Sequence, residues 1–220
     1  ILEADAILLP EKAGERAALA AVRRRLLAEV RPDAPVIPFD MPDREGNRPY
    51  LEAVARWHDA TARAWAAAIP PGARRVALLV WGDPSLYDST LRIAARLSPR
   101  PAVRVIPGIT ALQALTAAHA IPLNTLGGAV TITTGRRLRA EGWPHGAETL
   151  AVMLDAGGAF EVLDPERYEI WWGAYLGLPA EILEAGPLAG AAVRIRAARA
   201  AARAREGWIM DTYLLRQVAG

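Results

Sequence analysis

Short apolar runs of strand length alternate along the chain with longer stretches in which apolar residues recur every three or four positions. Residues 4–9 form the first run, and residues 19–30 carry leucines and valines at helical spacing. A short strand at 35–39 precedes a helix over 51–69, which ends at the helix-breaking residues 70–72. This alternation of strands and helices predicts an α/β architecture.

The same alternation continues to the end of the chain. The first half adds strands at 76–80 and 103–106 and helices at 90–97 and 110–119. The second half carries strands near 130–133, 149–154, 168–172 and 208–215, and an arginine- and alanine-rich helix over 189–204. Residues 121–128 contain a proline and paired glycines, which are typical of a hinge. We therefore expect an N-terminal α/β domain over residues 1–124, a C-terminal α/β domain over residues 125–220, and a cleft between them.

Composition narrows the class of protein. Hydrophobic residues make up 52% of the chain and charged residues 23%, as in folded globular proteins. The chain has no cysteine, and no apolar stretch approaches the roughly 20 residues that a membrane helix needs. A formal net charge of +2, with the arginines spread along the chain, does not favour nucleic acid as a partner. We expect a cytoplasmic protein that binds neither a membrane nor a nucleic acid.

The segment Gly82-Asp83-Pro84 follows an apolar run and precedes the predicted helix at 90–97. Gly82 allows a sharp turn and the close approach of a ligand, because it has no Cβ. Pro84 fixes the backbone, and Asp83 and Asp88 offer oxygens to uncapped helix amides. A strand, a glycine turn and a helix together form the crevice at the carboxyl end of a parallel sheet, where open α/β folds bind ligands. We expect a ligand site at this loop.

Further motifs follow: Ile-Pro-Gly at 106–108, Ile-Thr-Thr-Gly-Arg-Arg at 132–137, Val-Met-Leu-Asp-Ala-Gly at 152–157 and Gly-Trp-Ile-Met-Asp-Thr-Tyr at 207–213. Together with Gly-Asp-Pro, and in this order, they resemble the tetrapyrrole methylases over nearly the whole chain. The resemblance implies two α/β domains of the class III methyltransferase type, S-adenosylmethionine as methyl donor, and a homodimer. The last two phrases resemble the branch of cobalamin biosynthesis that methylates a corrin precursor, precorrin-5, at ring carbon 1. That branch releases acetate and gives precorrin-6A.

Members of this family usually begin with a strand and a glycine-rich loop that forms one wall of the cofactor site. The sequence begins instead at Ile1, with a segment that looks like the last turn of a helix. We therefore expect the N-terminal domain to lack this first strand and loop. Because a sheet without a central strand leaves backbone groups unpaired, we expect weaker folding and weaker cofactor binding.

The resemblance assigns cofactor-binding residues by their positions. Gly82, Asp83 and Leu86 match the loop that wraps the methionine and ribose portion of the cofactor. Thr110 and Ala111 match small residues after the Ile-Pro-Gly turn, where helix amides could hold the cofactor carboxylate. Three further residues are expected to contact adenosine or its surroundings: Met153, Leu154 and Ala174. Simple packing at loop ends is the alternative for each of these residues.

The expected substrate is a macrocycle with many carboxylates. Arg136 and Arg137 are expected to bind its carboxylate arms, because arginine pairs with carboxylates through two parallel hydrogen bonds. A solvated helix start is the alternative for this pair. Release of acetate needs attack by water on a ketone carbonyl, and hence a general base. Asp155 is the first candidate for this catalytic role, with Tyr87 and Asp211 as weaker candidates. The three histidines are scattered along the chain, so we expect no metal site.

Two other functions stay open at this point. Ribosomal RNA and diphthamide methyltransferases share the fold, although the small net charge does not favour RNA. The other alternative is a non-catalytic tetrapyrrole-binding or dimerisation module that lost its cofactor together with its first strand. Measuring the binding of S-adenosylmethionine separates an enzyme from such a module.

Overall fold

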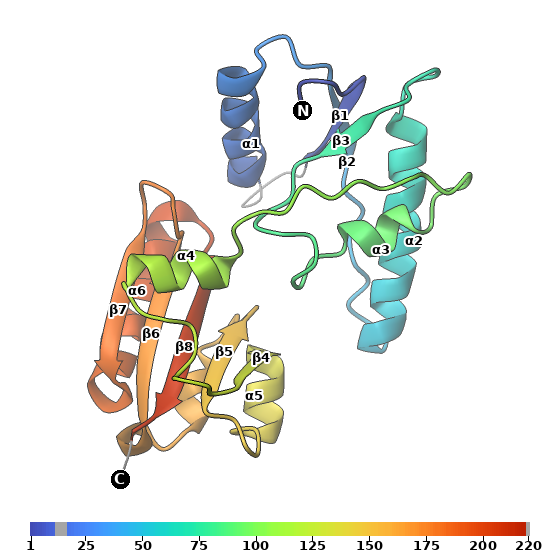
Figure 1. Ribbon diagram of the computed structural model, residues 1–220. Coiled ribbons are helices and arrows are strands. Elements are labelled where there is room, and N and C mark those ends of the chain that lie inside the picture. Colours follow the sequence, from blue (N-terminus) through green and yellow to red (C-terminus); the bar gives the residue numbers. More distant parts are fainter. Residues whose placement is uncertain (12–16, 219–220) are drawn as a thin grey trace. The chain divides into compact units, whose positions relative to one another are not determined.

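A computed structural model describes residues 1–11 and 17–218 of the chain (Figure 1). Contacts between Cα atoms divide the chain into two compact units, Ile1–Gly108 and Ile109–Gly220. Each unit contains its own sheet and its own helices, which confirms the predicted α/β class. The hinge expected at residues 121–128 lies within the second unit, and the domain boundary at residue 124 stays a prediction.

The first unit has a parallel sheet of three strands in the order β2-β1-β3. Its strands are β1 (Ala6–Glu11), β2 (Val36–Asp40) and β3 (Val76–Leu78), and its helices are α1 (Ala17–Val30), α2 (Tyr50–Ala68) and α3 (Thr90–Ala94). Leu8 of β1 packs in one cluster with residues of α2 and α3, whereas Ile7 packs with Leu27 of α1. The central strand is therefore covered on both faces, which explains its continuous apolar run.

The strand predicted at residues 103–106 is absent, and this prediction was wrong. Residues 101–110 adopt no regular secondary structure, and Val103 and Ile106 are 54% and 69% exposed. Valine and isoleucine favour strands, but a strand also needs a neighbouring strand for its backbone hydrogen bonds. β3 pairs only with β1 among the described residues, so its other edge is not paired with residues 103–106.

The second unit has a mixed sheet of five strands in the order β4-β5-β8-β6-β7 (Figure 1). The strands are β4 (Val130–Thr134), β5 (Thr149–Met153), β6 (Tyr168–Ala174), β7 (Ile182–Pro187) and β8 (Asp211–Gln217). The helices are α4 (Ala111–Ala118), α5 (Gly135–Glu141) and α6 (Leu188–Glu206), with short 3-10 helices η2 (Ala159–Val162) and η3 (Pro165–Arg167). β4 and β5 are parallel, whereas β8 runs antiparallel to both β5 and β6.

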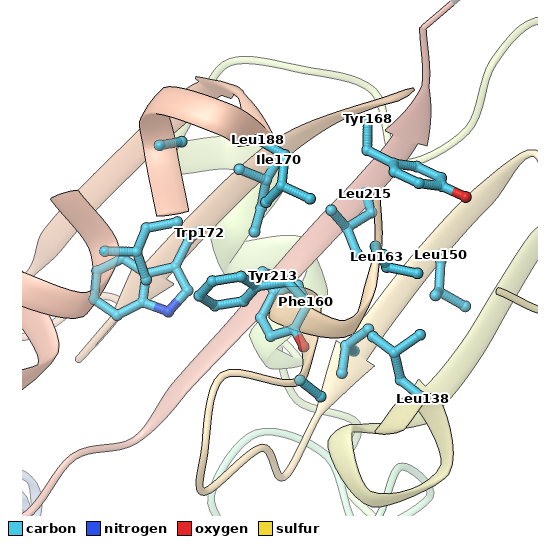
Figure 2. Packing of buried hydrophobic residues seen from close by; sticks show 14 of the residues in the cluster. Leu138, Leu150, Phe160, Leu163, Tyr168, Ile170, Trp172, Leu188, Tyr213 and Leu215 are labelled. Atoms are coloured by element: carbon cyan, nitrogen blue, oxygen red, sulfur yellow. The ribbon is translucent and has the colours of Figure 1, made fainter. Parts of the chain in front are cut away.

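The core of the second unit lies on one face of this sheet (Figure 2). Trp172 of β6 and Tyr213 of β8 are fully buried there, and the ring of Phe160 meets that of Tyr213 edge to face at 5.4 Å. Leu138 of α5 and Ile195 of α6 belong to the same cluster. α4 lies on the other side of the sheet from α6 (Figure 1). The sheet of the second unit therefore lies between α4 on one side and α6 on the other.

β7 was missing from the sequence prediction, and α5 entered it only as the alternative interpretation of Arg136 and Arg137, a solvated helix start. β7 pairs with β6 at the edge of the sheet and is only half-buried, so its apolar pattern is weak. α5 follows β4 directly and carries three arginines, and Leu138 is its only buried apolar side chain. A short helix with so little apolar surface has no periodic stripe that the sequence could reveal.

Candidate functional site

The Gly-Asp-Pro loop of the first unit is organised around the carboxylate of Asp83. Its Oδ1 accepts hydrogen bonds from the backbone amide of Ser85 (2.8 Å) and from Oγ of Ser85 (2.5 Å). Its Oδ2 accepts from the amide of Gly108 (2.9 Å), which lies in the Ile-Pro-Gly motif. The Ser85 hydroxyl, followed by these amides, lowers the pKa of Asp83. The carboxylate therefore stays charged and joins the two motifs.

This role differs from the helix cap that the sequence suggested for Asp83. The carboxylate that bonds to the start of α3 is instead that of Asp88, whose Oδ1 accepts from the amide of Thr90 (2.6 Å), whereas the side chain of the N-cap residue Ser89 makes no capping hydrogen bond. Asp83 and Asp88 are thus correctly placed in the same loop, but only Asp88 bonds to the helix. The sequence alone could not distinguish them, because the partner of Asp83 lies 25 residues away.

Glycine is required on both sides of this junction. Gly82 has a φ of +70°, a conformation that glycine adopts at no steric cost. A Cβ on Gly108 would lie 2.2 Å from the carbonyl oxygen of Gly82, which is far inside van der Waals contact. The two backbones therefore approach each other more closely than any other residue at 108 would permit.

The remaining predicted residues of the first unit lie in the same loop. The amide of Leu86 donates to the carbonyl oxygen of Asp83 (3.2 Å). Tyr87 has a φ of +49° and is 43% exposed. Positive φ is uncommon outside glycine, and such strained residues cluster at functional sites. The structure thus brings Gly82, Asp83, Leu86 and Tyr87 together in one turn.

The predicted residues of the second unit gather at one edge of its sheet. Thr134 pairs with Met153, so the carboxyl ends of β4 and β5 lie side by side, and Ala174 pairs with Asp211 at the same edge. Leu154, directly after β5, has a φ of +53° and is 63% exposed. Ala174 is fully buried, so its side chain belongs to the core. Of the cofactor-binding residues predicted at this edge, Leu154 is therefore the most exposed.

Thr110 and Ala111 begin α4. The amide of Leu112 donates to Oγ1 of Thr110 (3.3 Å), and the amide of Thr110 donates to Oε1 of Gln113 (3.2 Å). This reciprocal capping box gives the first turn of α4 its own acceptors. The helix start expected to hold a carboxylate is therefore already partly capped by the chain itself.

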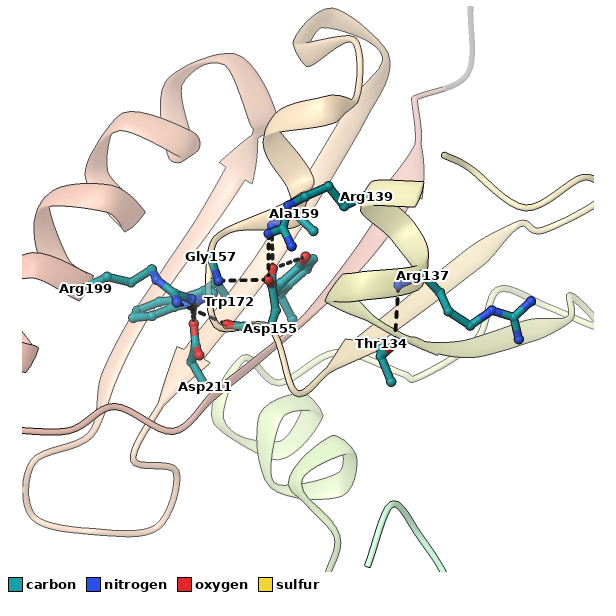
Figure 3. Close-up of polar contacts among 10 residues, drawn as sticks. Thr134, Arg137, Arg139, Asp155, Gly157, Ala159, Trp172, Arg199 and Asp211 are labelled. Atoms are coloured by element: carbon teal, nitrogen blue, oxygen red, sulfur yellow. Dashed lines mark hydrogen bonds and ion pairs between the residues drawn. The ribbon is translucent and has the colours of Figure 1, made fainter. Parts of the chain in front are cut away.

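Asp155 accepts hydrogen bonds from four donors (Figure 3). The hydroxyl of Tyr213 (2.7 Å) and the amide of Ala159 (2.5 Å) donate to Oδ2. The amide of Gly157 (3.1 Å) and Nη2 of Arg139 (3.2 Å) donate to Oδ1. The Asp155 side chain is only 1% exposed. This carboxylate therefore ties the loop after β5 to β8 and α5.

The same contacts decide the charge of Asp155. Burial alone would raise the pKa of this carboxyl group, but the Tyr213 hydroxyl, the amides of Ala159 and Gly157, and the charge of Arg139 together lower it. A carboxylate with a lowered pKa and four donors is a weak base. The arrangement favours a structural task for Asp155, while its catalytic role stays a prediction.

A second buried acid, Asp211, lies close to this network. The sequence predicted Asp211 only as a weaker candidate for the general base. Asp211 accepts hydrogen bonds from Nε1 of Trp172 (2.7 Å) and from Nη1 of Arg199, in an ion pair whose side chains are 4% and 12% exposed (Figure 3). Burial raises the pKa of Asp211. Nη2 of Arg199 also donates to the carbonyl oxygen of Asp155 (3.1 Å). In the sequence, only the position of Asp211 at the end of the Gly-Trp-Ile-Met-Asp segment indicated a role for this residue.

Arg136 and Arg137 lie in the first turn of α5 and are exposed. The amide of Arg137 donates to Oγ1 of Thr134 (3.4 Å), and its guanidinium forms a two-pronged pair with Glu141 (2.8 and 3.1 Å). The structure therefore places Arg136 and Arg137 at an exposed helix start, which was the alternative interpretation of this pair. Whether these arginines also bind substrate stays a prediction.

No group of three or more His, Asp and Glu side chains within residues 1–11 and 17–218 is arranged to hold a metal ion. None of the helices in these ranges is long and apolar enough to span a membrane.

Comparisons with known proteins show the family of the chain. The family model of the tetrapyrrole (corrin/porphyrin) methylases matches residues 1–192. The chain is 46% identical to a precorrin-6A synthase (deacetylating) of Sinorhizobium sp., over 98% of this chain and 86% of that protein. It is 31% identical to a precorrin-2 C(20)-methyltransferase of Sinorhizobium sp., over 69% of this chain and 62% of that protein.

Solved structures give the same result. A putative cobalamin synthesis related protein (CobF) from Corynebacterium diphtheriae superposes with a TM-score of 0.82 at 37% identity, over 98% of this chain and 88% of that chain. A uroporphyrin-III C-methyl transferase from Thermus thermophilus, complexed with S-adenyl homocysteine, has a TM-score of 0.53 at 19% identity, over 97% and 85% of the two chains, and shares the fold. The chain therefore belongs to the tetrapyrrole (corrin/porphyrin) methylases.

Proposed function

We propose that this protein is a precorrin-6A synthase of the deacetylating type. In this proposal it transfers a methyl group from S-adenosylmethionine to ring carbon 1 of precorrin-5 and releases acetate, giving precorrin-6A. The observation that carries the proposal is the 46% identity to the Sinorhizobium enzyme over 98% of the chain. A homodimer, as the family resemblance implies, and a cytoplasmic location are part of the same proposal.

The Gly-Asp-Pro loop fits the methyl donor that the family implies. Gly82 is exposed and offers backbone without a side chain, and Asp83 fixes its loop against Gly108. S-adenosylmethionine, when bound, supplies the methyl group on a sulfonium centre. We assign its contacts in the first unit to Gly82, Asp83 and Leu86. In the second unit we assign them to Thr110, Ala111, Met153, Leu154 and Ala174.

Methyl transfer from a sulfonium needs alignment and exclusion of water more than acid or base catalysis, because the sulfide leaves without charge. The rigid turn at Gly82 and Asp83 suits this positioning task. Release of acetate is a different step, since it needs a hydroxyl equivalent at a carbonyl carbon and therefore a proton acceptor. Asp155 and Tyr87 are the residues proposed for it, with Asp211 as a further candidate. Arg136 and Arg137 are proposed to bind carboxylate arms of the macrocycle.

Two measurements on the full chain test this function. Calorimetry with S-adenosylmethionine, with no tetrapyrrole present, measures cofactor binding. Incubation with precorrin-5 then measures methylated product and acetate in equal amounts. Binding without either product would favour a methyltransferase of the same fold with another substrate, such as ribosomal RNA or diphthamide. Absence of cofactor binding would favour a non-catalytic tetrapyrrole-binding module.

A further inference from the structure

Leu154 carries an exposed side chain on a strained backbone. It directly follows β5, has a φ of +53° and is 63% exposed. Tyr175 has the matching place after β6 and the same φ of +53°, but it is only 1% exposed, and its hydroxyl donates to the carbonyl oxygen of Trp208. Packing in the core therefore explains the conformation of Tyr175 and does not explain that of Leu154. A strained residue persists only where the structure around it holds it in place.

The backbone on both sides of Leu154 is fixed. On one side, β5 pairs with β4 and with β8, and its pairing with β8 ends at Val152 and Tyr213. On the other side, side chains bond to Asp155 in place of the strand pairing. The Tyr213 hydroxyl donates to Oδ2 of Asp155 (2.7 Å), and Nη2 of Arg199 donates to its carbonyl oxygen (3.1 Å). Leu154 therefore lies between a paired strand and an anchored aspartate.

Arg199 of α6 is itself held in place (Figure 3). Its Nη1 donates to Oδ2 of Asp211, which also accepts from Nε1 of Trp172 (2.7 Å). The side chains of Arg199 and Asp211 are 12% and 4% exposed. A buried ion pair often stabilises a fold no better than apolar side chains would, because both charges lose their hydration. The planar guanidinium, in contrast, holds two acceptors in a fixed geometry, here the Asp211 carboxylate and the Asp155 carbonyl group.

We propose that Arg199 is a positioning residue for the methyl donor. Anchored on Asp211, its guanidinium holds the carbonyl group of Asp155 and so keeps Leu154 in the left-handed conformation that presents it to the donor. All four residues belong to the second unit. The contact between Leu154 and the donor rests on the proposed function, whereas the effect of Arg199 on the backbone of Leu154 does not.

Arg199→Lys separates the ion pair from the positioning contact. Lysine keeps a positive charge beside Asp211, but it lacks the planar fork whose two arms reach both acceptors. In the full ¹³C,¹⁵N-labelled chain without methyl donor, the Cα and Cβ chemical shifts of Leu154 report its backbone conformation by NMR. We expect these shifts to leave the left-handed range in Arg199→Lys. Arg196→Lys, in the same helix, changes an exposed arginine paired with Glu161 and should leave the Leu154 shifts as in the parent.

Calorimetry then measures the affinity for S-adenosylmethionine. Arg199→Lys is expected to weaken it on the order of tenfold, as for the loss of one hydrogen bond from a charged donor, and Arg196→Lys to leave it unchanged. Leu154→Gly provides a second background, because glycine adopts a positive φ without strain. In that background Arg199→Lys should weaken binding by only about threefold or less, since the two positions are coupled. Equal losses in both backgrounds would mean that Arg199 does not act through Leu154, and would overturn the proposal.

Should Arg199→Lys not fold, Asp211→Asn makes the same comparison, since it removes the charge that anchors the guanidinium, with Asp164→Asn as its exposed control. Unchanged Leu154 shifts in the variant, or changed shifts with parental affinity, would overturn the proposal and leave the proposed function intact. A parent chain that binds no S-adenosylmethionine would overturn the proposed function and, with it, the task of Leu154 toward the donor. The NMR comparison contains no donor, so it would still decide whether Arg199 holds Leu154.

Discussion

Oδ2 of Asp83 accepts a hydrogen bond from the amide of Gly108 over 2.9 Å, and this bond joins the Gly-Asp-Pro loop to the Ile-Pro-Gly motif. The two motifs are separate in the sequence, yet their backbones meet so closely that a Cβ on Gly108 would lie 2.2 Å from the carbonyl oxygen of Gly82. The carboxylate of Asp83 and the backbone of Gly108 therefore hold the two motifs together as one structural unit. This contact fixes the turn at Gly82, to which we assign cofactor binding.

Gly108→Ala is therefore predicted to weaken S-adenosylmethionine binding on the order of tenfold or more, because the added methyl group must push the Gly82 carbonyl out of place. Overpacking of this kind costs about 1–3 kcal/mol of folding free energy. Calorimetry measures the affinity, and thermal unfolding measures the stability. Gly46→Ala is the control, since a Cβ there meets nothing within 4 Å. Parent-like affinity in Gly108→Ala would remove this junction from the cofactor site.

Asp155→Asn is predicted to lower the free energy of unfolding by about 1–3 kcal/mol. Both carboxylate oxygens accept from donors, so an amide NH₂ would face a donor in either orientation. Urea unfolding measures the change. Asp164→Asn is the control, because Asp164 is exposed and, among the described residues, its Oδ1 accepts only from the amide of Glu166 in the short helix η3.

The same variant tests the catalytic role assigned to Asp155. A general base contributes about 10²–10⁴-fold in rate. If Asp155 is that base, Asp155→Asn slows acetate formation from precorrin-5 by a factor in this range and leaves methyl transfer and cofactor affinity near those of the parent. Equal effects on both products, or none, would assign Asp155 to structure and direct the search to Tyr87, Asp211 or a bound water molecule.

The lowered pKa of Asp155 also predicts a pH dependence of stability. Burial raises this pKa, but the donors outweigh burial, so the folded value lies below the ordinary 3.8. In the window between the two values the unfolded chain binds more protons, and stability therefore rises with pH. The contribution is complete above about pH 5 and is lost as the pH falls through the folded pKa. Asp155→Asn cannot titrate there, so it should lose less stability than the parent on acidification; parallel unfolding curves across this window would contradict the prediction.

Much of the fold follows from local pattern. α2 and β1 lie close to their predicted ranges, because apolar periodicity over many residues needs no knowledge of distant partners. The segment at 103–106 has the composition of a strand and was wrongly predicted, because a strand also depends on a neighbour. β7 escaped prediction for the complementary reason, since pairing with β6 holds it despite a weak apolar pattern.

The candidate site likewise has features that the sequence could predict and features that it could not. Gly82 and Asp83 could be placed from the sequence, because a glycine turn after a buried strand is a local signal. The partners of Asp155 could not be predicted, since the Tyr213 hydroxyl that bonds to it lies 58 residues further along the chain.

Arg136 and Arg137 are predicted to act in substrate binding rather than in folding. Both are exposed in the first turn of α5, so replacing them with glutamine removes charge at little cost in stability. The double variant should raise the KM for precorrin-5 by about 30-fold, since each of the two lost pairings with a carboxylate weakens binding by about 1 kcal/mol. The value of kcat and the melting temperature should stay near those of the parent.

A control of the same chemistry tests whether the position matters or only the net charge. Arg196→Gln removes an exposed arginine of α6 that is paired with Glu161, much as Arg137 is paired with Glu141. Its KM should match that of the parent at any ionic strength. The KM of the parent should rise with salt, because exposed charge pairs are screened, and this rise should be smaller in the double variant. An unchanged KM in the double variant would mean that these arginines only begin a solvated helix, and the carboxylate arms must then be bound elsewhere.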